Sequence, residues 1–197
     1  PVPSSVVIPL YNKQQSAARA IRSVLGQSYP HFELIVVDDG STDASQAVAR
    51  SFNDPRMKLI TQPNQGVAAA RNRGVDAARC EYVCFLDADD EYAVDFLLEI
   101  NKLIAINPDA ALFSCRYKEV DDKGRPFLGN CDLPAGFFGE VADFFLHYKH
   151  SRSLICSSNI CARRQLIQQV GGFPEGQRIG EDIYLWLRLA LNGAVMF

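Results

Sequence analysis

The chain has 197 residues, enough for one domain with a sizeable hydrophobic core and too few for a string of modules. Apolar residues make up 48% and charged residues 22%, which excludes a disordered chain and a collagen-like repeat. Twenty Lys and Arg against 23 Asp and Glu leave a formal net charge of -3, so the chain lacks the basic footprint of a nucleic-acid binder.

The cysteines carry no metal or disulfide pattern. They stand at positions 80, 84, 115, 131, 156 and 161, mostly inside apolar runs and without a C-x-x-C pair, which is typical of buried free thiols in a reducing compartment. No stretch approaches the ~18 apolar residues of a membrane span, and no signal-peptide pattern opens the chain. We therefore expect a cytoplasmic protein, peripheral to the inner face of a membrane only through segments outside this sequence.

The two ends of the chain predict a piece of a longer protein. The sequence begins directly on a strand-like run and stops at Phe197, shortly after Gly193 closes a helical pattern. We therefore expect further chain beyond the C-terminus.

The first half of the chain alternates between strands and helices. Apolar, β-branched runs without alternation at residues 5–10, 32–37, 57–61 and 81–86 predict strands buried on both faces. Helical spacing of apolar residues predicts helices over residues 14–27, 44–52, 67–79 and 94–106. This rhythm predicts an α/β fold with a Rossmann-like, doubly wound, mostly parallel sheet that binds ligands at the carboxyl ends of its strands.

After Pro108 the rhythm loosens. The pattern predicts a strand over residues 110–120, a hairpin turn at 121–124, an irregular loop over 125–139 and a short helix over 138–148. A strand over 154–162 and helices over 164–170 and 181–191 follow.

Acidic residues cluster at the predicted end of the fourth strand. Asp87, Asp89 and Asp90 follow a wholly apolar run, and their mutual repulsion calls for a cation or hydrogen-bond donors. Oxygen ligands without nearby His or Cys favour Mg²⁺ or Mn²⁺. The alternative is that these carboxylates only cap the helix that follows, and the cluster taken alone leaves both interpretations open.

Three other segments carry polar groups with the same ambiguity. Asp38 and Asp39 end the second strand, where one carboxylate could accept the imide N–H of a pyrimidine base or serve the turn alone. Arg71 and Arg73 lie near the start of the third helix and face either phosphate or solvent. Glu181 and Asp182 open the last helix, where the helix dipole favours negative charge, so they act as a base or as caps.

The order of these segments resembles that of the family 2 glycosyltransferases with the GT-A fold. The matching segments are Val6-Val-Ile-Pro-Leu-Tyr-Asn12, Phe32-Glu-Leu-Ile-Val-Val-Asp-Asp-Gly-Ser-Thr-Asp43, Asn64-Gln-Gly-Val-Ala-Ala-Ala-Arg-Asn-Arg-Gly74, Phe85-Leu-Asp-Ala-Asp-Asp90, Gly171-Gly-Phe173 and Gly180-Glu-Asp182. Independent capping motifs would not fall in this order, so the resemblance favours function over capping.

The resemblance implies an inverting transfer of a sugar, with a nucleoside diphosphate donor of the UDP-sugar type, to an acceptor hydroxyl in polysaccharide or glycoconjugate synthesis. By the same resemblance, Pro9 and Tyr11 border the nucleotide, Asp39 reads its base and Arg71 assists there. Asp87, the first carboxylate of the D-x-D pair, faces the ribose or a metal-bound water.

The resemblance also implies the reactive groups. Asp89 matches the carboxylate that binds Mn²⁺ or Mg²⁺ bridging the diphosphate, and Asp182 matches the catalytic base. Residues 1–108 would form the nucleotide-sugar half and residues 109–197 the half that meets a carbohydrate or lipid-linked acceptor.

Two other classes of protein stay open. One is a nucleotide-sugar-binding module without catalysis, and the other is a phosphatase of the D-x-D type, which normally has Thr or Val where Asp90 and Glu91 stand. The sequence contains neither G-x-x-x-x-G-K-[ST] nor G-x-G-x-x-G, so P-loop enzymes and NAD-dependent dehydrogenases lack their fingerprint here.

Overall fold

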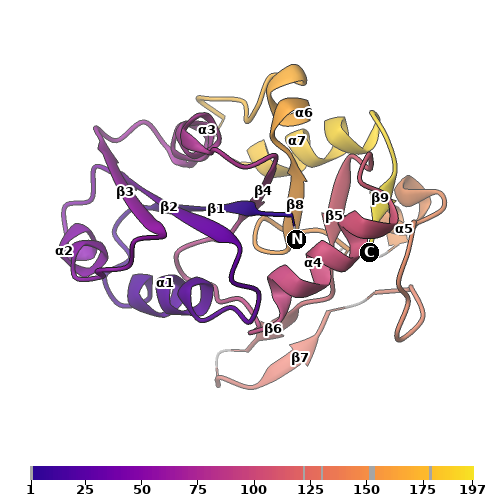
Figure 1. Cartoon of the computed structure of the whole chain (residues 1–197), viewed down its shortest axis with the longest axis horizontal. Coiled ribbons are helices and arrows are strands. Elements are labelled where there is room, and N and C mark those ends of the chain that lie inside the picture. The colour runs from indigo at the N-terminus through magenta and orange to yellow at the C-terminus, as the bar shows by residue number, and fades with distance from the viewer. Residues whose placement is uncertain (1, 122, 130, 151–153, 178) are drawn as a thin grey trace.

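A computed structural model of the chain shows a seven-stranded sheet with helices on both faces (Figure 1). The structure describes residues 2–121, 123–129, 131–150, 154–177 and 179–197. The strands are β1 (Ser4–Leu10), β2 (Phe32–Asp39), β3 (Met57–Gln62), β4 (Tyr82–Phe85), β5 (Leu112–Ser114), β6 (Lys118–Val120), β7 (Pro126–Leu128), β8 (Ile160–Arg163) and β9 (Val195–Met196). The helices are α1 (Ala17–Leu25), α2 (Ser45–Arg50), α3 (Val67–Ala77), α4 (Phe96–Ile106), α5 (Phe144–His150), α6 (Arg164–Gln169) and α7 (Glu181–Ala190).

The first four strands form the parallel part of the sheet. β1 pairs in parallel with β2 and β4, and β3 pairs in parallel with β2. β2 and β4 are buried along their whole length, which explains their continuous apolar runs. The predicted doubly wound, mostly parallel sheet is confirmed, and the carboxyl ends of β1, β2 and β4 meet at one edge.

The second half of the chain completes the sheet in mixed orientation. The strand order is β3-β2-β1-β4-β8-β5-β9. β8 runs antiparallel to both β4 and β5, and β9 runs parallel to β5. The chain therefore returns to place β8 between two strands that precede it in sequence.

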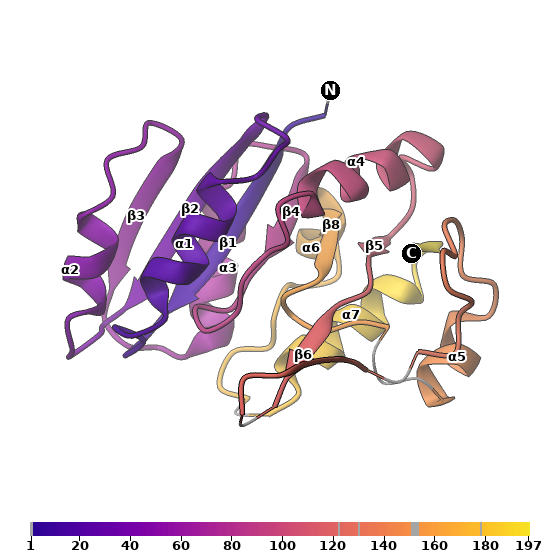
Figure 2. The ribbon, with the colours of Figure 1, turned by 90° about the horizontal axis from the view of Figure 1, so that it is seen from below.

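The helices divide between the two faces of the sheet. Residues of α1, α2 and α4 share one hydrophobic core with Val6 and Ile8 of β1. Residues of α3, α6 and α7 share the other core with Val7 of the same strand. Figures 1 and 2 show this layering, with α1 and α4 on one side of the sheet and α3, α6 and α7 on the other.

The predicted strand over residues 110–120 is wrong as a single element. The structure has β5 and β6 there. β6 pairs with β7 in a separate two-stranded sheet, and β7 lies inside the segment predicted as an irregular loop. Each of these two strands has only three residues, all of them exposed, so neither carries the long buried apolar run that marks β1 and β2. Asp121 accepts hydrogen bonds from the backbone N–H groups of Lys123 and Arg125 at the predicted turn, and Asp122 lies outside the described residues.

Two further predicted boundaries differ from the structure, because the backbone there forms hydrogen bonds with other segments or side chains of the same chain. The predicted helix over 138–148 starts only at Phe144, since Gly139 exchanges backbone hydrogen bonds with Phe197 and the Val141 N–H donates to the Val195 carbonyl. The predicted strand over 154–162 starts only at Ile160. Asn159 explains this shift, since its side chain bonds the backbone of Cys156 and Cys115 and shapes a loop.

All six cysteines are free thiols, as the sequence predicts. Cys84 and Cys161 are fully buried and face each other across β4 and β8. Within the described part of the chain, no helix has both the length and the apolar character to cross a membrane.

Candidate functional site

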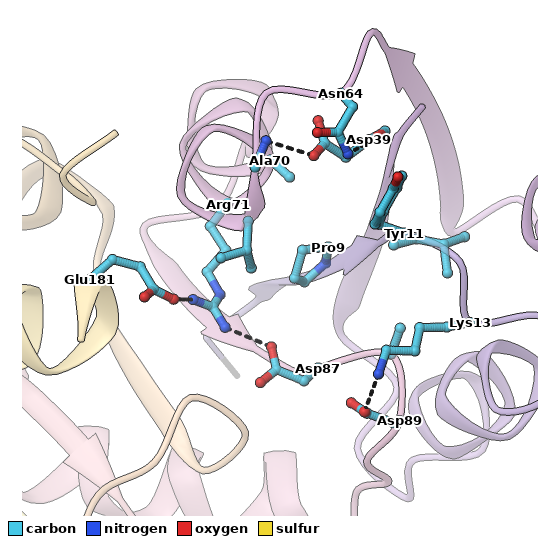
Figure 3. Close-up of a pocket in the computed structure, with 14 residues that line it drawn as sticks. Pro9, Tyr11, Lys13, Asp39, Asn64, Ala70, Arg71, Asp87, Asp89 and Glu181 are labelled. Carbon is cyan, nitrogen blue, oxygen red and sulfur yellow. Dashed lines mark hydrogen bonds and ion pairs between the residues drawn. The ribbon is translucent and has the colours of Figure 1, made fainter. Parts of the chain in front are cut away.

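The predicted nucleotide residues line one cavity of about 500 Å³ at the carboxyl ends of β1, β2 and β4 (Figure 3). The lining residues are Pro9, Leu10, Tyr11, Lys13, Asp39, Asn64, Gly66, Val67, Ala70, Arg71, Asp87, Ala88, Asp89 and Glu181. Thus Pro9, Tyr11, Asp39, Arg71, Asp87 and Asp89 come together, whereas Asp182 is not among the lining residues.

The end of β1 supplies an open wall of this cavity. Pro9 is half-buried and its neighbour Tyr11 is 45% exposed. An exposed aromatic ring beside a cavity offers a flat apolar face on which a planar ligand can stack.

Asp39 is the buried acceptor of the site. The residue is 2% exposed, and its carboxylate accepts hydrogen bonds from the Gln62 side chain at 2.8 Å and from the backbone N–H groups of Gln65 at 2.9 Å and Gly66 at 2.8 Å. Gly40 makes this approach possible: its φ is +73°, and a Cβ there would lie 2.7 Å from the Asn64 backbone nitrogen. The segment before α3 is therefore folded around the Asp39 carboxylate.

Arg71 on α3 is a buried cation between two carboxylates. It is 3% exposed, its Nη2 donates to Asp87 at 2.7 Å and its Nη1 donates to Glu181 at 2.9 Å (Figure 3). Its guanidinium also lies over the ring of Phe173, 5.3 Å from the ring centre. Arg71 therefore joins the strand end of β4 to the first turn of α7.

The D-x-D pair does not cap the next helix. α4 begins at Phe96 with Asp95 at its N-cap, well after Asp89. The side chain of Asp89 is instead 51% exposed and pairs with Lys13, whose Nζ lies 2.5 Å from Asp89 Oδ2. The capping interpretation of this cluster is therefore wrong, and Asp89 faces the cavity.

Asp90 lies beside the pair in a different setting. Desolvation raises the pKa of the Asp90 carboxyl, a hydrogen bond from Ser158 opposes this shift, and the negative charges of Asp87 and Asp89 add to it. The Ser158 hydroxyl donates to Asp90 at 2.6 Å and accepts the Asp87 backbone N–H at 3.1 Å. The pKa of Asp90 is therefore raised mainly by desolvation, with a smaller contribution from the two neighbouring carboxylates.

Asp182 occupies the first turn of α7, as the sequence predicts. Its carboxylate accepts a hydrogen bond from the Ser157 hydroxyl at 2.7 Å and one from the Ile183 backbone N–H at 2.7 Å. Its neighbour Glu181 is the residue that lines the cavity and binds Arg71. The two residues of the pair thus serve different surroundings.

The sequence reasoning did not single out Lys13, Ser157 or Ser158. Lys13 follows Tyr11 closely at the end of the first strand, and this position in the sequence is the feature that could mark it as a site residue. The two serines are brought to the site only by the return of the chain at β8, and no local pattern marks them.

A family model described as glycosyl transferase family 2 matches residues 5–167. The chain belongs to this family.

Solved structures and curated relatives agree with the family. A crystal structure of S. aureus TarS in complex with UDP-GlcNAc is 26% identical, with a TM-score of 0.80 over 98% of this chain and 55% of the TarS chain. An uncharacterized glycosyltransferase of Rickettsia felis is 34% identical over 97% of this chain and 31% of its own length. A mannosyltransferase of Pyrobaculum calidifontis, solved with GDP-Man and Mn²⁺, shares the fold at 22% identity and a TM-score of 0.72.

These likenesses confirm the GT-A type of fold. The family 2 chain described here spans about a third of the length of that curated relative and just over half of the TarS chain.

The carboxylates of Asp87 and Asp89 are groups of this family 2 chain that could hold a hard divalent cation. Asp87 and Asp89 present oxygen ligands at the cavity, and the described residues hold no group of three or more His, Cys, Asp or Glu arranged around a metal position. Mg²⁺ and Mn²⁺ sites with one or two carboxylates complete their shell with water and substrate phosphates.

Proposed function

We propose that this chain is an inverting glycosyltransferase that moves a sugar from a UDP-sugar to an acceptor hydroxyl. The observation that carries the proposal is the convergence of Asp39, Asp87 and Asp89 on one cavity of about 500 Å³. The TarS structures with UDP-GlcNAc and with UDP, both 26% identical to this chain, support a uridine nucleotide as its ligand.

The nucleotide end of the cavity is built for a base and a ribose. Pro9 and the exposed ring of Tyr11 border the base, and the buried Asp39 carboxylate accepts its imide N–H. Asp87 uses Oδ1 for Arg71, which leaves Oδ2 to accept a ribose hydroxyl or a metal-bound water. Arg71 acts by fixing Asp87 and by lowering the electrostatic cost of an anionic ligand nearby.

Asp89 would hold the divalent cation, Mn²⁺ or Mg²⁺. When bound, the cation stabilises negative charge on the departing diphosphate. Asp89 lines the same cavity as Asp39 and Asp87, which supports this role.

Asp182 is our proposed base. Its carboxylate accepts the proton of the acceptor hydroxyl while that oxygen bonds to the anomeric carbon and the bond from that carbon to the diphosphate oxygen breaks. The attack comes from the face opposite the leaving group, so the configuration inverts and the nucleoside diphosphate leaves with the electron pair. The Ser157 hydrogen bond and the position in the first turn of α7 orient the carboxylate.

We propose a carbohydrate or lipid-linked hydroxyl as acceptor, in polysaccharide or glycoconjugate synthesis. The six free thiols support a reducing compartment such as the cytoplasm, and contact with the inner face of a membrane would bring lipid-linked acceptors to the site.

A thermal-shift comparison tests the donor. UDP with Mn²⁺ should raise the melting temperature more than GDP or TDP with Mn²⁺, because only the uracil imide matches Asp39 and Tyr11 without an added amino or methyl group. At a ligand concentration ~100 times Kd, the stabilisation is about 2.7 kcal/mol. Asp39→Asn should remove the preference for UDP, since its amide also presents donors. Stabilisation by GDP or TDP but not by UDP would contradict the base assignment.

Product analysis separates catalysis from binding alone. A preparation that binds UDP-sugar and Mn²⁺ and releases UDP only with an acceptor present supports a transferase. Binding without transfer to any hydroxyl acceptor would support the module without catalysis instead.

A further inference from the structure

The charges around the cavity do not balance. Its described lining holds four carboxylates, those of Asp39, Asp87, Asp89 and Glu181, but two cations, Lys13 and Arg71. Arg71 is 3% exposed and held between two of the carboxylates. Lys13 is therefore the lining cation that can move.

Lys13 already occupies the carboxylate proposed for the metal. Its Nζ lies 2.5 Å from Asp89 Oδ2, with the two side chains 43% and 51% exposed (Figure 3). A pair this exposed contributes little stability, so the contact can be exchanged at small cost. A cation that binds Asp89 Oδ2 would compete with this ammonium group.

The backbone of Lys13 is fixed, while its side chain is half-exposed and is held by the ion pair with Asp89. Its N–H donates to Ser45 Oγ at 2.7 Å, and Ser45 is fully buried. Its carbonyl accepts the N–H of Ala17 at 2.8 Å, at the start of α1. The preceding residue Asn12 accepts the Thr42 N–H at 2.8 Å, which ties the segment after β1 to the segment after β2. Only the four-carbon stem of Lys13 is left to swing.

We propose that Lys13 is an exchangeable counter-ion: it neutralises Asp89 in the ligand-free cavity and transfers to the diphosphate of the donor when metal and nucleotide enter together. This inference rests on the proposed function, because it takes Asp89 as the metal ligand and a nucleoside diphosphate as the ligand of the cavity. It adds Lys13 as a residue that binds phosphate and that favours entry of the metal together with the nucleotide.

Two opposite effects follow from one charge. A free divalent cation meets the like charge of the ammonium and must displace it, so Lys13 weakens binding of the metal alone. A diphosphate carries negative charge that the ammonium binds through charge-assisted hydrogen bonds, so Lys13 strengthens binding of the nucleotide. The arrangement favours the metal–nucleotide complex over the metal by itself.

Lys13→Met tests the proposal because it keeps the stem and removes the charge. Binding of Mn²⁺ alone, measured by the electron paramagnetic resonance of the free ion, should tighten about 3- to 10-fold. Binding of UDP with Mn²⁺, measured by calorimetry, should weaken at least about tenfold. Binding of uridine, which has no phosphate, should stay within about twofold of the original value.

Two variants serve as controls. Lys13→Arg keeps the charge and should restore both metal and UDP binding toward the original values. Lys102→Met removes the matched lysine of α4, whose Nζ lies 2.6 Å from Glu99 with side chains 52% and 37% exposed, and should change neither. All variants should melt within about 4 °C of the original protein, because only half-exposed ion pairs are lost.

The outcomes separate this inference from the function on which it rests. If the original protein binds neither UDP nor Mn²⁺, the proposed function fails. If it binds both and Lys13→Met changes Mn²⁺ and UDP affinity in the same direction, or changes neither, the exchange of Lys13 is wrong while the proposed function stands.

Discussion

Arg71 holds carboxylates from two distant parts of the chain, and among the described residues it is the cation with which each of them pairs. The side chain of Asp87 is 32% exposed and that of Glu181 is 10% exposed, so Glu181 in particular depends on the guanidinium for compensation of its charge. A lysine could not serve both, because the two hydrogen bonds use both terminal nitrogens of one planar fork. The residue is therefore structural as well as functional.

Replacing Arg71 should be severe for stability. Arg71→Met should lower the free energy of unfolding by about 3–5 kcal/mol, because it leaves partly buried carboxylates uncompensated. Urea denaturation measures the loss. Arg79→Met is the matched control: Arg79 also pairs with a glutamate, Glu33, but its side chain is 83% exposed, so the loss should be below about 1 kcal/mol. Equal losses for the two variants would contradict the structural role of Arg71.

Substitutions of Asp182 and of Glu181, at the start of α7, should have different effects on turnover. Asp182→Asn should lower turnover at least ~10²-fold with donor affinity nearly unchanged, since the proposed base does not line the donor cavity. Glu181→Gln should have a smaller effect on turnover and should act through Arg71. Calorimetry of the donor and product analysis of sugar transfer measure the two quantities. Turnover near the original value in Asp182→Asn would place the base elsewhere.

The sequence could predict the acidic residues of the site but not their partners. Asp39, Asp87 and Asp89 follow apolar runs, and parallel strands bring their carboxyl ends to one edge. The bond from Ser157 to Asp182 joins residues 25 positions apart, and that from Lys13 to Asp89 joins residues 76 apart. Such contacts follow from tertiary packing, which local spacing does not encode.

At the level of elements, α3 lies unusually close to β1. A Cβ built on Gly74 would lie 2.3 Å from Cγ1 of Val7, and Val7 is fully buried. The helix can therefore rest on the strand only because residue 74 has no side chain. Arg71 lies one turn earlier on the same helix, so the close contact also sets the height of its guanidinium above the sheet.

Gly74→Ala should therefore destabilise the protein. Overpacking typically costs about 1–3 kcal/mol, which exceeds the ~1 kcal/mol that alanine gains over glycine within a helix. Urea denaturation measures the change. Adding Val7→Ala should recover part of the loss in the double variant, because it removes the clashing methyl groups. If Gly74→Ala proved more stable than the original protein, the close approach of α3 and β1 would be wrong.

Helices and strands could be predicted from the sequence where burial produces a regular pattern of apolar residues. β1, β2 and β4 are buried and apolar, and the apolar residues of the amphipathic helices between them recur at helical spacing. β6 and β7 have three exposed residues each, and β9 has only two residues, so none of them has an apolar run long enough to recognise. Their pairing depends on which backbone lies alongside.

Across the whole molecule, the thiols behave as parts of the interior. Desolvation raises the pKa of Cys115 and of Cys156 to about 12. Both thiols are therefore neutral in the folded protein at pH 8, while an unfolded thiol titrates near 9. The stability that they contribute is full below pH ~9 and is lost as the pH rises from there toward 12.

Alkylation should report this state. Iodoacetamide at pH 8 should modify Cys115 and Cys156 slowly in the folded protein and rapidly in urea, because the thiolate is the nucleophile. Peptide mass analysis identifies the modified positions. Dithiothreitol should leave the melting temperature unchanged, since the cysteines are free. Rapid labelling of both thiols without urea would show that they are exposed as thiolates.

Residues from both proposed halves of the chain, 1–108 and 109–197, form the site. Arg71 binds Glu181, and the Asp87 backbone binds Ser158, so groups of the first part are completed by groups of the second. The order of strands explains why the sequence could not show this: β8 enters the sheet between β4 and β5.

That insertion also sets an order for synthesis. As the chain leaves the ribosome, β4 is made early, but its partner β8 ends only at Arg163, so one edge of the wholly buried segment Tyr82–Phe85 has no strand to pair with until then. An apolar edge of this kind readily pairs with other chains. Nascent chains of this protein should therefore need a chaperone, or slow partial folding, over the interval between these two strands, and polypeptides that end near residue 108 should aggregate.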